Sequence, residues 1–187
     1  FQINKKTHIC KPMSKKQPEV KVYETFESMG LRDELLKGIY KMGYVKPSPI
    51  QQRAIVPILS GSDVIAQSQS GTGKTATFSV GVLSRVEPAQ REVQAIIVSP
   101  TRELAKQSEK VLRGLASFLP IQVRACVGGS AEKEDVRALE QGCQVVSGTP
   151  GRLSVLIRKR VLRTSFVRVL VLDEADEMLN RGFMQQV

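Results

Sequence analysis

The stretch IAQSQSGTGKTATF, residues 65–78, places two glycines, a lysine and several hydroxyl residues at the start of a helix-forming segment. The apolar run DVIAQ at 63–67 predicts a strand, and the pattern that follows the glycines predicts a helix near 74–86. In a loop between a strand and a helix, backbone N–H groups converge on one point and favour an anion there. We therefore expect a phosphate-binding loop.

The residues of this loop have separate expected roles. Gly71 and Gly73 would let the backbone pass close to a phosphate. Lys74 would reach the outer phosphates as a point charge, and the Thr75 hydroxyl would ligate Mg²⁺. The general pattern G-x-x-x-x-G-K-[ST] has a glycine where this chain has Ser68, so a glycine-rich turn without a ligand is the alternative. The expected nucleotide contacts of the loop are Ser70, Gly71, Thr72, Gly73, Lys74, Thr75 and Ala76.

Length and composition favour one soluble domain. The chain has 187 residues, of which 41% are hydrophobic and 25% charged, enough to bury a sizeable core. It contains neither an apolar run of membrane-spanning length nor a signal-peptide pattern, so we expect an intracellular protein with no membrane partner. The cysteines Cys10, Cys126 and Cys143 lack metal-ligand spacing, and His8 lies in a polar segment. We predict no disulfide, zinc site or histidine catalysis.

The formal net charge is +10, which favours a polyanionic partner such as nucleic acid. Part of this charge lies in residues 1–22, where six lysines accompany one glutamate. We expect that segment to be a basic, disordered tail, and residues 23–187 to form the folded domain. The first residue is Phe1 rather than methionine, so we expect a fragment of a longer protein.

Apolar runs alternate with helical patterns along most of the chain. Two helices are expected first, near 31–43 and 49–59. Strands are then expected at 63–67, 94–99, 122–127, 143–148 and 167–172, separated by helices near 74–86, 101–118, 130–141 and 150–160. Nearly continuous apolar strands with crossover helices predict an α/β fold, a parallel sheet with helices on both faces.

The last apolar run is followed directly by Asp173, Glu174 and Asp176. Ligands of parallel α/β sheets bind at the carboxyl ends of the strands, so these acids should share an edge with the phosphate-binding loop. Asp173 would hold Mg²⁺ and Glu174 would orient or deprotonate the attacking water, which with Lys74 makes three candidate catalytic residues. The alternative is an acidic helix N-terminus, which the helix dipole stabilises.

The combination of SGTGKT with DEAD resembles the DEAD-box RNA helicases. GYVKPSPIQ at 43–51, PTRELAKQ at 100–107, the pair Gly128-Gly129 and TPGR at 149–152 occur in the family's order. The resemblance covers residues 24–187 and is greatest with the initiation-factor-four-A group, particularly its exon-junction member. It implies a RecA-like P-loop domain, the first of two helicase domains, and a loop that normally departs from the general pattern at position 68.

By this resemblance, the Gln51 side-chain amide pairs with adenine, Tyr44 stacks on the ring and Lys46 lies beside the nucleotide. Phe26 stands at the upstream aromatic position. The chemistry agrees, because an amide offers a donor and an acceptor together and an aromatic face suits a base. Taken alone, the same residues would be a solvated glutamine and a half-buried tyrosine.

The resemblance also implies RNA-contacting residues. They would grip phosphates and sugars and read little sequence. Taken separately, PTRELAKQ could be an ordinary helix start and TPGR an ordinary turn. The implied contacts are Pro100, Thr101, Arg102, Gly128, Gly129, Thr149, Pro150, Gly151 and Arg152.

Two family features have no counterpart in the sequence: the Ser-Ala-Thr motif and the second RecA-like domain. In the family, the strand leading to Ser-Ala-Thr lies between the phosphate-loop strand and the Asp-Glu-Ala-Asp strand. The second domain supplies arginine fingers, and such a finger is worth about 10³ to 10⁵ in rate in related phosphoryl transfer. We expect this chain to bind ATP and Mg²⁺ but to hydrolyse ATP poorly.

The expected activity of the longer protein is ATP-dependent unwinding of short RNA duplexes. The alternative is an ATP-locked clamp on RNA within a multiprotein assembly for RNA processing or translation, in the nucleus or the cytoplasm. A metabolic P-loop kinase would leave the matches at 43–51, 100–107 and 149–152 unexplained.

Overall fold

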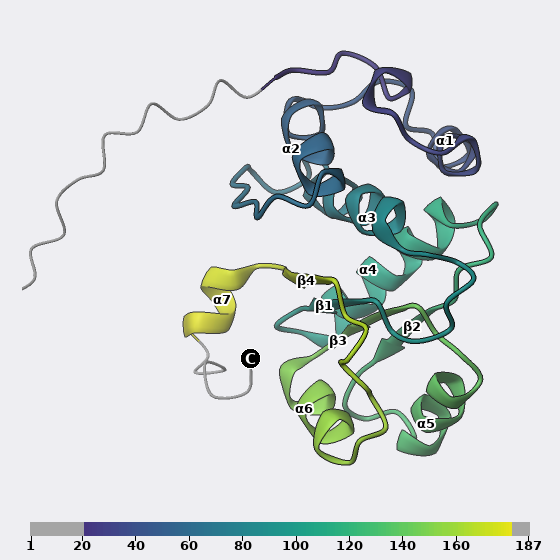
Figure 1. The fold of residues 1–187 in the computed structure, drawn as a ribbon. Coiled ribbons are helices and arrows are strands. Elements are labelled where there is room, and N and C mark those ends of the chain that lie inside the picture. Colours follow the sequence, from purple (N-terminus) through teal and green to yellow (C-terminus); the bar gives the residue numbers. More distant parts are fainter. Residues whose placement is uncertain (1–20, 181–187) are drawn as a thin grey trace, which may run out of the picture.

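Four parallel strands form the centre of the computed structural model, which describes residues 21–180 (Figure 1). They are β1 (Ala95–Val98), β2 (Val123–Cys126), β3 (Val145–Gly148) and β4 (Val169–Leu172). Their order across the sheet is β2-β3-β1-β4. The last residues of the strands are in register, because Val98 pairs with both Gly148 and Leu172, and Cys126 pairs with Gly148. All four strands therefore end at one level.

Helices lie on both faces of this sheet (Figure 1). The helices are η1 (Glu27–Met29), α1 (Asp33–Lys41), α2 (Pro49–Leu59), α3 (Lys74–Arg85), α4 (Arg102–Leu115), α5 (Glu132–Glu140), α6 (Pro150–Arg158) and α7 (Ala175–Asn180). The predicted α/β fold with a parallel sheet is confirmed. The short helices η1 and α7 are additions to the predicted set. Within residues 21–180, no helix is long and apolar enough to cross a membrane.

The alternation of side chains along the strands divides the core in two. Ala95 and Ile97 of β1 pack with residues of α1 to α4, whereas Ile96 and Val98 pack with α6 and the residues around it. Every residue of β1 is buried, as expected for a central strand of a parallel sheet with both faces covered. Burial on both faces fixes the position of β1 in the core. Its pairing with β3 and β4 then sets the level at which those strands end.

The prediction of a strand over residues 63–67 is wrong. Among the described residues, no backbone N–H of residues 63–69 donates to another backbone group, and Val64 and Ile65 are exposed. Strand β4 has β1 on one side and no described strand on the other, and its Leu170 and Leu172 are 57% and 44% exposed. The resemblance implies one more strand between these two segments, and the structure describes none there among residues 21–180. An apolar run forms a strand only where a neighbour completes its hydrogen bonds.

Hydrogen exchange tests this correction. We expect the amides of residues 64–67 to exchange at nearly unprotected rates, because they lack backbone partners. The amides of Ile96 and Ile97 in β1 should be among the most protected in the same chain. Equal protection of the two segments, measured by NMR or mass spectrometry, would show that residues 64–67 pair as a strand.

Candidate active site

The predicted phosphate-binding loop has the backbone conformation that its glycines allow. Gly71 and Gly73 adopt φ angles of +79° and +98°, and Gly73 is the N-cap of α3. A Cβ on Gly73 would lie 2.8 Å from Nε2 of Gln51 and 3.3 Å from Oγ of Ser48. Only glycine fits both the left-handed conformation and the close approach of α2. The loop is thus held against the segment expected to read adenine.

Hydrogen bonds inside the loop explain the serine that replaces the pattern's first glycine. The Ser68 and Thr72 hydroxyl oxygens lie 2.7 Å apart, and the Thr72 hydroxyl also approaches the Gln69 carbonyl at 2.7 Å. The Lys74 ammonium donates to the Ser68 carbonyl at 3.0 Å. Ser68 therefore stabilises the loop through its side chain as well as its backbone, a role that the general pattern does not reveal.

Lys74 also joins the loop to the acidic segment. Its Nζ lies 3.6 Å from Oε1 of Glu174, and both side chains are partly exposed. The Asp173 N–H donates to the Val98 carbonyl at 2.9 Å, which extends the pairing of β4 with β1 by one residue. Helix α7 begins directly after Glu174, so the acids are also at a helix start, as the alternative interpretation supposed. The two interpretations are compatible.

Burial raises the pKa of Asp173 above its ordinary value, and the negative charge of Glu174 raises it further, while Lys74 opposes the effect. An ionised Asp173 is therefore costly unless a cation is nearby. The Asp173 carboxylate and the Thr75 hydroxyl are oxygen donors of the kind that Mg²⁺ prefers, and this ion usually needs only one or two carboxylates besides phosphate oxygens. Within the described residues no three His, Cys, Asp or Glu side chains cluster as a metal site. The donor set fits a phosphate-bound Mg²⁺.

The residues expected to hold adenine lie at the start of α2. Gln51 is only 4% exposed, its Oε1 accepts the Ser48 N–H at 2.8 Å, and its Nε2 faces Gly73. Tyr44 is half-buried against the core and Lys46 is exposed. Phe26 is buried in that core. The Ser48 N–H therefore orients the Gln51 amide through its oxygen, and the amide nitrogen faces the predicted phosphate-binding loop.

The expected RNA contacts follow the carboxyl ends of three strands. Thr101 caps α4 after β1, and its hydroxyl accepts the Leu104 N–H at 3.2 Å. Gly128 and Gly129 follow β2, and Thr149 is the N-cap residue of α6 after β3. Pro100 and Pro150 are buried beside these caps, and Gly151 is exposed. Because the strands end at one level, the three segments share one edge of the sheet.

Arg102 and Arg152 have different surroundings. The Arg102 guanidinium lies over Gly128 and Gly129, and it makes no hydrogen bond or ion pair with any described residue. The Arg152 side chain is only 10% exposed and donates to the carbonyls of Val127 and Ser130 at 3.2 and 2.6 Å. Arg102 is thus available to a ligand, whereas Arg152 is bound within the protein.

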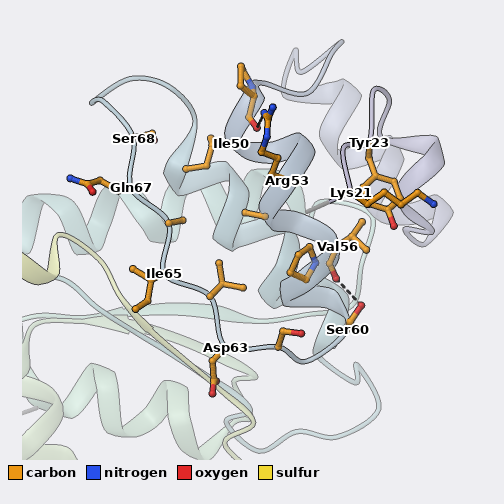
Figure 2. Close-up of a pocket in the computed structure, with 16 residues that line it drawn as sticks. Lys21, Tyr23, Ile50, Arg53, Val56, Ser60, Asp63, Ile65, Gln67 and Ser68 are labelled. Carbon is orange, nitrogen blue, oxygen red and sulfur yellow. Dashed lines mark hydrogen bonds between the residues drawn. The ribbon is translucent and has the colours of Figure 1, made fainter. Parts of the chain in front are cut away.

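A pocket of about 800 Å³ lies between α2 and the segment at 62–68 (Figure 2). Ile50, Val56 and Ile65 are among its largely apolar lining residues. None of the predicted site residues lines it. The pocket borders the segment that has no described strand neighbour, and it adjoins the candidate site at Ser68, whose carbonyl accepts the Lys74 ammonium.

Comparisons with known proteins agree with this geometry. The family model for DEAD/DEAH box helicases matches residues 48–187. The chain is 58% identical over 170 residues to eukaryotic initiation factor 4A-III homolog A of Oryza sativa subsp. japonica, covering 91% of this chain and 42% of that protein. It is also 58% identical over 169 residues to eukaryotic initiation factor 4A of Dictyostelium discoideum, covering 90% and 42%.

The fold is also that of solved relatives. S. cerevisiae Dbp5 bound to RNA and ADP BeF3 is similar with a TM-score of 0.78 and 42% identity, over 88% of this chain and 42% of that chain. The predicted resemblance and the RecA-like fold are confirmed. The chain spans about two fifths of the length of these relatives.

The buried charge of Asp173 leads to a prediction about stability. We expect Asp173→Asn to raise the Tm at pH 7 without nucleotide or metal, because it removes an ionised group whose pKa burial has raised. Because the folded-state pKa of Asp173 is raised, the free-energy penalty of its charge is complete at pH values above that pKa. The penalty disappears at pH values below the unfolded-state pKa. The gain should therefore shrink as the pH falls toward 4. The exposed Asp176→Asn is the control, and a lower Tm for Asp173→Asn at pH 7 would contradict the assignment.

Proposed function

Because the chain belongs to the DEAD/DEAH box helicase family, we propose that it is the ATP-binding half of an ATP-dependent RNA helicase that separates short RNA duplexes. The main support is that Lys74 and Glu174 lie 3.6 Å apart at the sheet edge that also carries Thr101, Gly129 and Thr149. A nucleotide site and a backbone-binding surface on one edge would allow hydrolysis to be coupled to RNA binding.

In this proposal the loop at 70–76 holds the phosphates. Its backbone N–H groups and the N-terminus of α3 face the anion, and Lys74 supplies the cation. Gln51 and Tyr44 hold the adenine, and Lys46 lies at the margin of that site. Thr75 and Asp173 would hold Mg²⁺, which would neutralise charge on the phosphates during transfer.

Glu174 is proposed to orient or deprotonate the attacking water. Its carboxylate lies 3.6 Å from the Lys74 ammonium. A triphosphate at the loop competes for the same ammonium, so binding leaves the Glu174 carboxylate free to accept a proton. The ion pair therefore prevents Glu174 from acting before the substrate is in place.

RNA is proposed to bind through its backbone to the segments after β1, β2 and β3, with little sequence preference. The free guanidinium of Arg102 and the hydroxyls of Thr101 and Thr149 are suited to phosphates and sugars. In the longer protein a second RecA-like domain would complete this surface and supply arginine fingers. The isolated chain should bind nucleotide and hydrolyse it slowly.

The second candidate function is an ATP-locked clamp on RNA inside a multiprotein assembly for RNA processing. The clamp requires the same site as the helicase but differs from it in the rate of product release. Either function would be carried out in the nucleus or the cytoplasm. Repeated strand separation by the longer protein would support the helicase, whereas slow release with long retention of RNA would support the clamp.

Lys74→Ala tests the nucleotide site. We expect ATP affinity to fall roughly 10- to 100-fold, because a charge-assisted bond is worth about 1.5–3 kcal/mol. Titration calorimetry of the 187-residue chain measures the change. Lys106→Ala on the exposed side of α4 removes an equal charge and should bind ATP as the unmodified chain does. Unchanged ATP affinity in a folded Lys74→Ala protein would rule out this assignment of the loop.

Glu174→Gln tests the role of the base in the longer protein. The amide keeps the shape and removes the basic oxygen, so ATP binding should survive while hydrolysis falls by about 10²-fold or more. ATP that is not hydrolysed should prolong the complex with RNA, because the ATP state is proposed to bind RNA most tightly. Single-turnover hydrolysis and RNA dissociation in excess ATP measure the two effects. Hydrolysis at the original rate would contradict the role of Glu174.

A further inference from the structure

Asp135 is a fully buried carboxylate at the centre of a group of charges between β2, α5 and α6. Its side chain is 0% exposed, and its Oδ1 accepts hydrogen bonds from Nε and Nη2 of Arg124 at 3.3 and 3.2 Å. Its Oδ2 has no hydrogen-bond donor among the described residues, but lies 3.8 Å from Nε of Arg152. Burial of such a charge is costly unless it is paired, so this arrangement needs both arginines.

Arg152 connects this carboxylate to the loop that contains Gly128 and Gly129. Its guanidinium donates to the Val127 carbonyl, which precedes the two glycines, and to the Ser130 carbonyl, which follows them. The Ser130 hydroxyl closes the same loop by donating to the Val127 carbonyl at 2.8 Å. One guanidinium therefore fixes both ends of the loop.

The shape of the loop decides where Arg102 lies. Gly129 has φ of +85°, and a Cβ on Gly128 would lie 3.3 Å from Nη2 of Arg102. The Arg102 side chain rests on this glycine surface and has no hydrogen-bond or ion-pair partner among the described residues. A change in the loop would therefore displace the Arg102 guanidinium, which no described residue binds and which can meet a phosphate.

Two other acids contribute less to the position of Arg152. Glu132 lies 3.8 Å from Nη1 of Arg152, but it is shared with Lys159, whose Nζ is 2.5 Å from its other oxygen. Glu134 pairs with Arg124 and is largely exposed. Screening by water weakens such pairs, so Asp135 is the acid whose charge acts on Arg152 with least screening.

We propose that Asp135 is a positioning residue for RNA binding: it orients Arg152, which holds the Val127–Ser130 loop so that Gly128, Gly129 and Arg102 face the RNA backbone together. The inference rests on the proposed function, because it assumes that this edge binds RNA. It assigns Arg152 a role inside the protein in place of the direct contact that the family resemblance implied.

Asp135→Asn tests the proposal, because it keeps the shape and removes the charge. We expect the affinity for a short fluorescein-labelled oligouridine, measured by anisotropy at low salt, to fall roughly 5-fold or more, the scale of changes within one coupled network. Affinity for ADP should stay the same, because the phosphate-binding loop is on another part of the edge. Glu140→Gln, an equal charge change at the exposed end of α5, should alter neither affinity.

Arg152→Lys is a second variant that keeps the charge and cannot donate to both carbonyls. It should lower the RNA affinity in the same way, and it should shift the amide resonances of Gly128 and Gly129 while those of Gly71 and Gly73 stay in place. These NMR shifts need no RNA, so they report the loop directly even if Asp135→Asn does not fold.

The outcomes separate the proposal from the function on which it rests. Loss of RNA affinity with ADP affinity retained supports the positioning role. Unchanged RNA affinity in both variants, or an equal loss of RNA and ADP affinity, overturns it. Arg102→Ala tests the RNA surface itself: if it leaves RNA affinity unchanged, the proposed RNA edge is wrong, and if it lowers RNA affinity while Asp135→Asn and Arg152→Lys do not, only the role of Asp135 is wrong.

Discussion

Val98, Cys126, Gly148 and Leu172 occupy one level of the parallel sheet, and each is the last residue of its strand. Hydrogen bonds continue past this level, from the Asp173 N–H to the Val98 carbonyl, from Ser99 to Gly148 and from Thr149 to Cys126. Strand pairing therefore extends to Ser99, Thr149 and Asp173, and the chain leaves the sheet after these residues. This pairing brings Val98 and Leu172, which are 74 positions apart in the chain, side by side at one edge, and no single loop could do so.

The strand order then separates two groups of charges along the edge. Asp173, Glu174 and Lys74 lie at the β4 end, where the phosphates are expected, whereas Arg152 and Asp135 lie at the β2 and β3 end. Central strand β1 lies between them and hydrogen-bonds to both sides. Strand β1 is therefore a contiguous hydrogen-bonded connection between the proposed nucleotide end and the proposed RNA end of this edge.

The sequence predicted the elements and motifs that depend on local pattern. It did not predict the features that depend on which segments lie next to one another in space. The run at 94–99 was predicted as a strand, and β1 forms there because both of its sides are occupied. The run at 63–67 also contains apolar residues, but no strand of the described residues pairs with it and it forms none. Asp135 stands among four consecutive charged residues, and nothing in that pattern shows that it alone is buried. The Gly-Lys-Thr and Asp-Glu-Ala-Asp motifs could be located from sequence because their chemistry requires those residue types.

The predicted phosphate-binding loop is held mainly from its helix side. A loop of this kind is usually fixed from both sides, by the strand before it and the helix after it. Here the helix side carries the constraint: α3 packs against α2, the Arg85 guanidinium donates to the Ile58 carbonyl, and Gln51 lies against Gly73. On the other side, Lys74 donates to the Ser68 carbonyl within the loop and lies 3.6 Å from Glu174, which follows β4. The lysine expected to bind phosphate is therefore also a group that holds the loop, so a nucleotide that draws this ammonium away must replace its contacts with Ser68 and Glu174.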